Sequence, residues 1–351
     1  MTENQFISEL ETALKRLPAE ERNDIIQDIR EYFTDGRVDG KSESDIAASL
    51  GSPANIAKEL LGAYSFEEKK FEEKKVEIVS TNKVITIQDD RFTNVDINVQ
   101  HGALVVRPSH NSVTTVELVG ANDKLQLSAQ VINDTLVVRL KSISHWLFIF
   151  NLSINFNVKA VTLNVFIPKK LYQSFAMKTD NGRISAEKLL AKKMDVNTDN
   201  GRIQLREIAA TTLIAETDNG RIEMEKVQAD HMRMKTDNGR IEMRYVDAES
   251  IGVESDNGRI ELEHITGSIV GTTDNGRITL QTDTLDRALD FRTDNGSIVI
   301  QSIEKPTNAT ILAKTGHGKI DIFGERNSRT VIGAGEHTIR LKSDNGRITV
   351  S

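Results

Sequence analysis

Residues 217–243 read TDNGRIEMEKVQADHMRMKTDNGRIEM, and the hexapeptide TDNGRI occurs in them twice, first at Thr217 and again at Thr236. The same motif or a close variant begins at Thr179, Thr198, Thr217, Thr236, Ser255, Thr273, Thr293 and Ser343, and a degenerate TGHGKI begins at Thr315. The first five copies follow one another at a constant step, and the later steps vary in length. A period of this kind predicts a protein built from stacked repeats.

Apolar and polar residues alternate on both sides of each motif, which is the pattern of a strand with one buried face. After Gly220, Ile222 and Met224 share one parity, while Glu223 and Glu225 share the other. Aligned copies place isoleucine two positions after the glycine, at Ile184, Ile203, Ile222, Ile241, Ile260, Ile278, Ile298, Ile320 and Ile348. Each coil then adds one layer to a continuous core, as in a β-solenoid. Coils of about 19 residues are too short for the blades of a β-propeller, which need roughly 40.

The Asn-Gly pair of each motif is a strong turn signal because both residues tolerate a positive φ. We predict a structural turn in each coil, formed in the central coils by Asn200, Gly201, Asn219, Gly220, Asn238, Gly239, Asn257 and Gly258. The asparagines either form an amide ladder along the stack or are passive residues of a left-handed turn. His101 and His317 stand where Asn would, each followed by Gly, and this favours the passive role.

Residues 1–65 differ in kind from the rest, because their apolar residues fall at helical spacing. Thr2 and Gln5 form a capping box, and Ser52 followed by Pro53 predicts the start of a helix that runs to about Tyr64. We predict a helical interaction domain at 1–65, a charged linker at 66–75 (FEEKKFEEKK) and a mainly β domain at 76–351.

Charge is concentrated in the helical head and its linker. Residues 1–75 hold 11 Lys and Arg against 17 Asp and Glu, while residues 76–351 hold 34 against 35. An acidic head argues against a nucleic-acid partner, which would require a basic surface. It favours a protein partner instead.

The 351-residue chain has no cysteine, which excludes disulfides and thiolate metal sites and fits a reducing compartment. Neither a signal peptide nor a stretch of about 20 apolar residues is visible. We therefore expect a cytoplasmic protein without a transmembrane segment, peripheral to the membrane at most.

Two segments resemble known families. ESDIAASLGSPANIAKELL, residues 43–61, resembles the HAAS signalling domain of bacteria. LNVFIPKKLYQSFAMKTDNGRISAEKL, residues 163–189, and the coils after it resemble a bacterial adhesin-like β-solenoid family of unknown function. The resemblance implies a right-handed, β-helix-like fold and a link to envelope-stress signalling or cell-surface association. It implies no catalytic residues.

Each motif carries an Asp, from Asp180 to Asp344, followed three positions later by Arg in every full copy except the one with Ser297. Stacked carboxylates could bind calcium. By parity, however, Asp and Arg share the outer face, so we expect the arginines to neutralise the Asp column. Neither His101 nor His317 has a second histidine at ligand spacing. We therefore expect neither a metal nor a cofactor.

The arginines are the first candidate interaction residues, in particular Arg202, Arg221, Arg240 and Arg259. Beside Gln204, Glu223, Glu242 and Glu261 they form a striped face, which is either a solvated surface or a groove for an anionic polysaccharide. Trp146, Phe148 and Phe150 are the second candidates. They either cap the core or dock onto a membrane or a partner.

The repeated coils contain no G-x-S-x-G, P-loop, H-E-x-x-H or Rossmann motif, and near-identical coils offer no unique catalytic constellation. We predict a non-enzymatic interaction or scaffold protein. The alternative is a solenoid that binds or cleaves an anionic cell-wall carbohydrate.

The long step between Thr315 and Ser343 inserts the segment GERNSRTVIGAGEHT, residues 324–338, between coils. Because an exposed terminal strand recruits other chains, we expect the charged segment Glu325 to Arg329 to shield the last edge, or that edge to pair with a second molecule. At the other end, we expect the coil containing residues 76–106 to be covered by the linker or the head.

Overall fold

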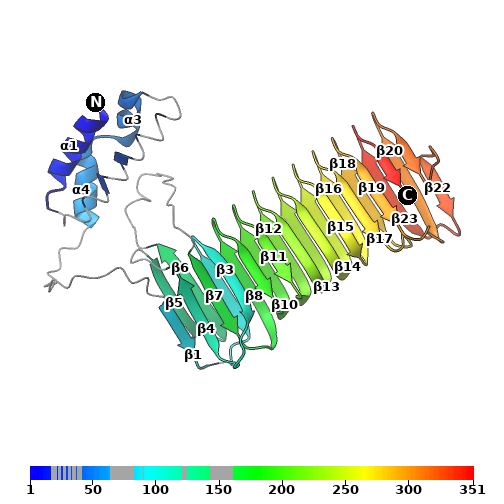
Figure 1. The fold of residues 1–351 in the computed structure, drawn as a ribbon, viewed down its shortest axis with the longest axis horizontal. Helices are drawn as coiled ribbons and strands as arrows, with labels where there is room; N and C mark the ends of the chain where they lie inside the picture. Colours follow the sequence, from blue (N-terminus) through cyan, green and yellow to red (C-terminus); the bar gives the residue numbers. More distant parts are fainter. Residues whose placement is uncertain are drawn as a thin grey trace. The chain divides into compact units, whose positions relative to one another are not determined.

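The computed structural model describes residues 1–16, 22, 25–26, 29–30, 33, 37, 42–63, 83–89, 91–120, 125–142 and 161–351. The chain divides into a helical unit and a β unit, drawn in Figure 1. Trp146, Phe148, Phe150 and residues 66–75 lie outside the described residues, so the roles and domain limits assigned to them stay predictions. No described helix is long and apolar enough to span a bilayer.

The helical unit contains α1 (Glu3–Ala13), α3 (Glu43–Leu50) and α4 (Pro53–Ala63). The capping box predicted at Thr2 and Gln5 is present, with both of its hydrogen bonds. Ser52 accepts a hydrogen bond from the Asn55 backbone at 3.2 Å, as expected for the cap of α4. A small core built around Phe6, Leu10 and Phe33 joins these segments.

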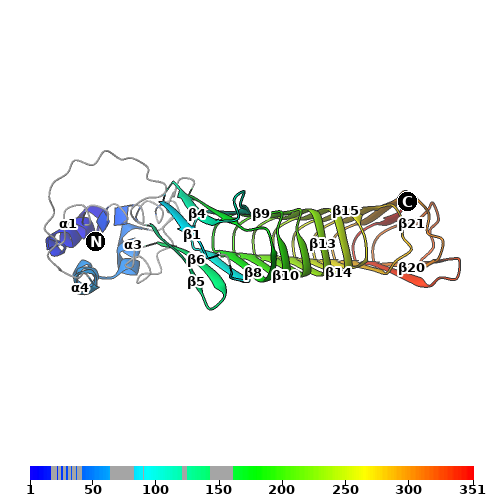
Figure 2. The ribbon, with the colours of Figure 1, turned by 90° about the horizontal axis from the view of Figure 1, so that it is seen from below.

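The β unit is a stack of coils with two strands in each coil, which form the two layers visible in Figure 2. We call the strands that lead into the Asp-Asn-Gly bend layer A and those that follow it layer B. Neighbouring coils pair in parallel, and β13 and β14 continue from layer B into layer A.

In spatial order, layer A consists of β5 (Leu125–Ile132), β6 (Thr135–Ser142), β2 (Asn94–Val99), β8 (Leu171–Thr179), β10 (Leu190–Thr198), β12 (Ala209–Thr217), β13 (Ile222–Thr236), β14 (Ile241–Ser255), β16 (Ser268–Thr273), β18 (Leu289–Thr293), β23 (His337–Ser343), β20 (Ala309–Thr315) and β22 (Arg329–Ile332). Layer B consists of β1 (Lys83–Ile87), β4 (Thr114–Val119), β7 (Thr162–Ile167), β3 (Ala103–Pro108), β9 (Ile184–Glu187), β11 (Ile203–Arg206), the first parts of β13 and β14, β15 (Ile260–Ile265), β17 (Ile278–Thr282), β19 (Ile298–Ser302), β24 (Ile348–Val350) and β21 (Ile320–Ile322).

The register predicted from the constant motif step is present in the central coils. Ile203, Ile222 and Ile241 pair in succession. All three are fully buried, as the isoleucine column predicts. Ile320 is the exception and is only half-buried, because its coil lies at the end of the stack.

The prediction that the motif residues need a positive φ is wrong for the central coils. Neither Asn219 nor Gly220 has a positive φ, nor do their equivalents at 200–201, 238–239 and 257–258. The chain passes through the left-handed region at the opposite corner instead, between layer B and the next layer A strand. The residues concerned are Lys188, Glu207, Lys226, Tyr245 and His264, with φ from 49° to 58°.

Glycine is required at the motif because the coils approach each other closely there. A Cβ added to Gly220 would lie 1.6 Å from the carbonyl oxygen of Gly201 and 2.6 Å from the Thr217 hydroxyl. No side chain fits such a space. Glycine therefore occupies this position for its small volume rather than for its backbone freedom.

The buried hydroxyl of the motif joins successive coils. Thr236 Oγ1 accepts a hydrogen bond from the Gly239 N–H at 3.0 Å and donates one to the Gly220 carbonyl of the preceding coil, also at 3.0 Å. Because Thr236 is fully buried, its hydroxyl satisfies the Gly239 amide and the Gly220 carbonyl inside the stack.

The asparagines form the amide ladder, so the passive role favoured from the sequence is wrong. The Nδ2 of each asparagine donates to the Oδ1 of the preceding one at 2.8–2.9 Å, through Asn181, Asn200, Asn219, Asn238, Asn257, Asn275, Asn295 and Asn345. The ladder lies on the exposed side of the same corner and runs through copies whose sequence spacing varies.

The coils at the C-terminal end do not stack in chain order. β23 lies between β18 and β20, and β24 lies between β19 and β21. The last coil of the chain is therefore internal. At the N-terminal end, β2 lies between β6 and β8, and β3 between β7 and β9. Further strands of the β unit thus cover the coil that contains residues 94–108.

The inserted segment does protect an edge, although not the expected one. Residues Arg329–Ile332 form β22, which pairs antiparallel with β20. The covered strand belongs to the coil of residues 309–322 rather than to the final copy. The shielding strand also begins where the predicted segment, Glu325 to Arg329, ends.

We predict that Gly220→Ala lowers the free energy of unfolding by about 3 kcal/mol, because the new methyl group overpacks the contact with Gly201. Gly252→Ala is the matched control, since its Cβ would meet no atom closer than 3.8 Å. Alanine at 252 should leave stability unchanged or raise it by up to about 1 kcal/mol. Urea unfolding of the two variants tests this, and equal stabilities would contradict the packing argument.

The stacking order predicts that Ile348→Ala costs roughly 2–5 kcal/mol although the residue is close to the C-terminus, because it lies in an internal coil. Ile320→Ala, in the end coil, should cost clearly less. A stack in chain order requires the opposite ranking. Unfolding free energies of the two variants therefore decide between the two arrangements.

Candidate functional site: the charged face of layer B

The outward side chains of layer B form an ordered charged surface, which we call the charged face. It comprises Arg202, Arg206, Arg221, Arg240, Arg244 and Arg259 together with Gln204, Glu223, Glu225, Glu242, Glu261 and Glu263. These residues alternate along the strands with the buried core positions, so the strand pleat directs them outward. Six arginines and five glutamates thus lie side by side on one surface of the stack.

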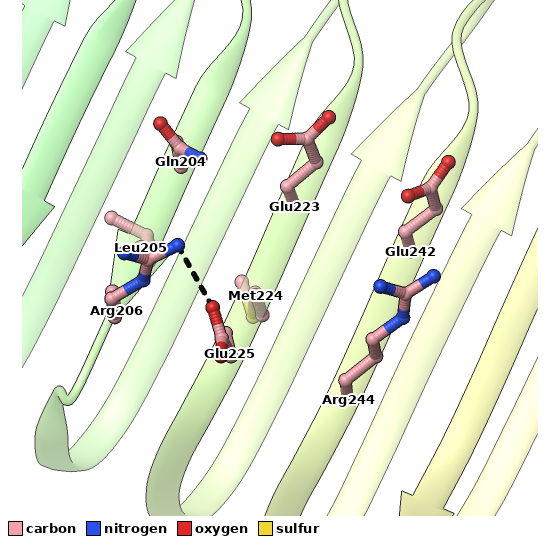
Figure 3. A pocket seen from close by; sticks show the side chains of 8 residues that line it. All are labelled: Gln204, Leu205, Arg206, Glu223, Met224, Glu225, Glu242 and Arg244. Atoms are coloured by element: carbon pink, nitrogen blue, oxygen red, sulfur yellow. Dashed lines mark ion pairs between the residues drawn. The ribbon is translucent and has the colours of Figure 1, made fainter.

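A shallow hollow lies on this face, shown in Figure 3. Its volume is about 270 Å³, and its lining residues are Gln204, Leu205, Arg206, Glu223, Met224, Glu225, Glu242 and Arg244. A second hollow of about 200 Å³ continues over Glu242, Glu261 and Glu263 to Thr279 and Gln281. Together they form a shallow charged surface that crosses several coils.

The predicted pairing of the motif arginines with the Asp column is wrong. Arg221 lies 3.1 Å from Glu223 on its own strand and 3.9 Å from Glu242 on the next. Arg240 repeats this arrangement with Glu242 at 2.8 Å and Glu261 at 4.0 Å. The reason is geometric, because a residue two positions along a strand lies on the same face.

The Glu223 and Glu242 side chains are about four-fifths covered, with exposed fractions of 20% and 18%. The charge-assisted hydrogen bond from Arg240 to Glu242 raises the pKa of the arginine above its usual value, so its charge persists at any physiological pH. Arg202 completes the row with a longer contact of 3.8 Å to Glu223. Three of the four predicted interaction arginines, Arg202, Arg221 and Arg240, thus lie within 4.0 Å of a glutamate carboxylate.

The structure shows a second column of charges that the sequence analysis did not identify. Five positions after each motif glycine the residues alternate in sign: Glu187, Arg206, Glu225, Arg244 and Glu263, with Arg107 adjoining Glu187 from β3. Ion pairs join Arg107 to Glu187 (3.5 Å), Arg206 to Glu225 (2.9 Å) and Arg244 to Glu263 (3.1 Å). Reading that aligned position down the copies would have revealed the column.

Within the described ranges, no group of three or more His, Asp or Glu side chains has the arrangement of a metal site. The Asp column is exposed except at Asp180 and Asp237, which are partly buried. Partial burial and the neighbouring Asp199 raise the pKa of Asp180. The charged face therefore offers balanced charge, and its charged side chains repeat at the spacing of β-strands, about 4.8 Å.

Comparison with known proteins identifies both parts of the chain. The family model described as Toastrack DUF4097 matches residues 92–351, and the HAAS model matches residues 5–59. No curated protein matches the chain.

Several solved structures resemble the chain at low sequence identity. A candidate adhesin of Bacteroides fragilis NCTC 9343 is 14% identical, with a TM-score of 0.44 over 78% of this chain and 98% of that one. Candidate adhesins of Parabacteroides distasonis ATCC 8503 and Parabacteroides merdae ATCC 43184 are each 12% identical, with TM-scores of 0.49 and 0.47 over 77% of this chain and 98% and 96% of theirs. From the match over residues 92–351, the chain belongs to the Toastrack DUF4097 family, and it carries an N-terminal HAAS domain.

Proposed function

We propose that the chain is a non-catalytic interaction protein in which a stiff coil stack presents the charged face to a protein partner. The observation that carries this proposal is the pairing of arginine with glutamate along layer B. A surface whose charges are already balanced attracts no single sign of charge strongly, but it fixes the register of a partner with a complementary pattern.

The same pairing weighs against the anionic-polymer alternative. A polyanion binds by exchanging its counterions for cationic side chains, yet on this face Arg206, Arg221 and Arg240 already contact glutamates. A polymer would have to break these pairs, and the Glu223–Glu261 row would repel it.

The acidic helical head supplies the second half of the proposal. Residues 1–75 carry most of the excess negative charge of the chain, and the HAAS match lies within them. We infer that the head relays engagement of the coil stack to a second protein, in envelope-stress signalling or in cell-surface association. We also infer right-handed coils, because crossover connections between parallel strands of one sheet are almost always right-handed.

We predict that inverting charge on this face abolishes partner binding. A photo-crosslinking amino acid at Gln204 should capture a protein in the native host. Arg206→Glu/Arg244→Glu should remove the adduct, because it turns the alternating column into an acidic one. Arg233→Glu/Arg292→Glu is the matched control, since both arginines are exposed on layer A and also contact carboxylates. This variant should retain the adduct.

Two results would contradict the proposal. Purified protein that retains polygalacturonate or polyphosphate, and loses this property in Arg206→Glu/Arg244→Glu, would support the polymer alternative. New reducing ends released from a cell-wall polymer would show an enzyme.

A further inference from the structure

A third hollow, of different chemistry, lies at the corner of the β unit where layer B turns into layer A. It has a volume of about 290 Å³ and lies where β7 turns into β8 and where β9 turns into β10. The residues that line it are Pro108, Pro168, Lys169, Lys170, Tyr172, Lys188, Leu189, Leu190 and Glu207. Three lysines and one glutamate therefore border a mainly apolar hollow.

Lys170 departs from the pattern of the stack. It precedes β8 as Leu189 precedes β10 and Ile208 precedes β12, and those two aliphatic side chains are buried. The Lys170 ammonium lies 4.4 Å from the centre of the Phe92 ring and 5.4 Å from that of Tyr172. Such contacts with ring faces hold the cation at the rim of the hollow.

The aromatic base beneath Lys170 is fixed. Tyr172 is 1% exposed, and its hydroxyl donates to the Pro168 carbonyl at 2.8 Å. Its ring stacks on Phe92, with 6.0 Å between the ring centres. The position of the cation is thus set by buried groups rather than by solvent.

Lys169 and Lys188 add two further cations from successive coils. Lys188 occupies the left-handed corner, with φ 58°, and its Nζ lies 3.2 Å from Glu187. Outside residues 1–75 the chain is close to neutral, with 34 Lys and Arg against 35 Asp and Glu. The three lysines outnumber the two carboxylates beside them, Glu187 and Glu207, which leaves a local excess of positive charge.

Exposed leucines adjoin these lysines. Leu190, in the lining, keeps 47% of its surface exposed, and its register partner Leu171 keeps 54%. In the coils that follow, the same register position is occupied by Ala209, Gln228 and Asp247. The combination of exposed leucine with lysine thus occurs in the two coils that form the hollow.

We propose that this hollow binds an anionic amphiphile, a molecule with a phosphate or carboxylate at one end and an apolar chain behind it. The lysines would form charge-assisted hydrogen bonds with the anionic group, and Leu190, Leu171 and Pro168 would remove part of the chain from water. This site is separate from the charged face and does not depend on the function proposed for it.

Titration calorimetry of the full chain with dodecyl phosphate, below its micelle concentration, tests the proposal. The variant Lys169→Gln/Lys188→Gln should weaken binding at least tenfold, and Leu190→Gln should weaken it several-fold. Lys226→Gln is the control, because Lys226 occupies the same left-handed corner two coils beyond Lys188 but does not line the hollow. It should bind like the wild type, and equal melting temperatures would show that all variants fold.

Two further ligands test separately whether binding requires the anionic group and the apolar chain. Dodecyl maltoside should bind at least tenfold more weakly than dodecyl phosphate, and inorganic phosphate at an equal concentration should not displace dodecyl phosphate. Displacement by inorganic phosphate would refute the apolar half of the proposal. Equal binding of the neutral detergent, or equal weakening by Lys226→Gln and the double variant, would refute the cationic half.

Discussion

The structure of the β unit depends on the contact between successive coils at the Asp-Asn-Gly corner. Each motif glycine lies directly against the carbonyl of the glycine in the preceding coil, as Gly220 does against Gly201, and no Cβ fits there. A buried hydroxyl, such as that of Thr236, supplies a partner to the amide of its own glycine and to the carbonyl of the preceding one. The asparagines join the same corner on its exposed side through their amide ladder. The threonine, the asparagine and the glycine of the motif thus each meet a separate requirement of close coil packing.

This corner also explains how the stack tolerates irregular coils. The asparagine ladder continues from Asn295 directly to Asn345, although the whole coil of residues 309–322 lies between the two in the sequence. Neighbours are defined by the match of corner to corner rather than by chain order. The coil that ends at Val350 can therefore insert between two earlier coils, and residues 309–322 move to the end of the stack, where β22 covers one of their edges.

Much of the fold was predictable because the signals repeat. Alternation at Ile222 and Met224 and the constant motif step determine the buried columns, and Thr2 and Ser52 mark helix starts that the structure confirms. The turn conformation was mispredicted because the rule that links Asn-Gly to a positive φ comes from isolated hairpins. In a stacked corner, glycine is required instead because no larger residue fits between the coils. The order of the coils in the stack was not predictable, because the copies are nearly identical and each of them could pair with any other.

The candidate site was predicted only in outline. Parity placed the arginines of the charged face on the outer surface beside Glu223, Glu242 and Glu261. It could not decide whether the arginines contact these glutamates or the Asp column, because that choice depends on side-chain reach across strands. The hollow at Lys170 was missed for a different reason. Lys169 and Lys170 precede the first copy of the motif, at Thr179, so no aligned column contains them, and Lys188 alone does not indicate a site.

Amide hydrogen exchange at the corner tests the central claim most directly. The Gly220, Gly239 and Gly258 amides each donate to a hydroxyl that is buried in the stack. If this contact holds the coils together, these amides exchange only when the whole β unit unfolds, as slowly as those of Ile222 and Ile241. Exchange at the rate of an exposed bend, while the neighbouring isoleucines stay protected, would show that the corner is an open turn and that the core alone holds the coils.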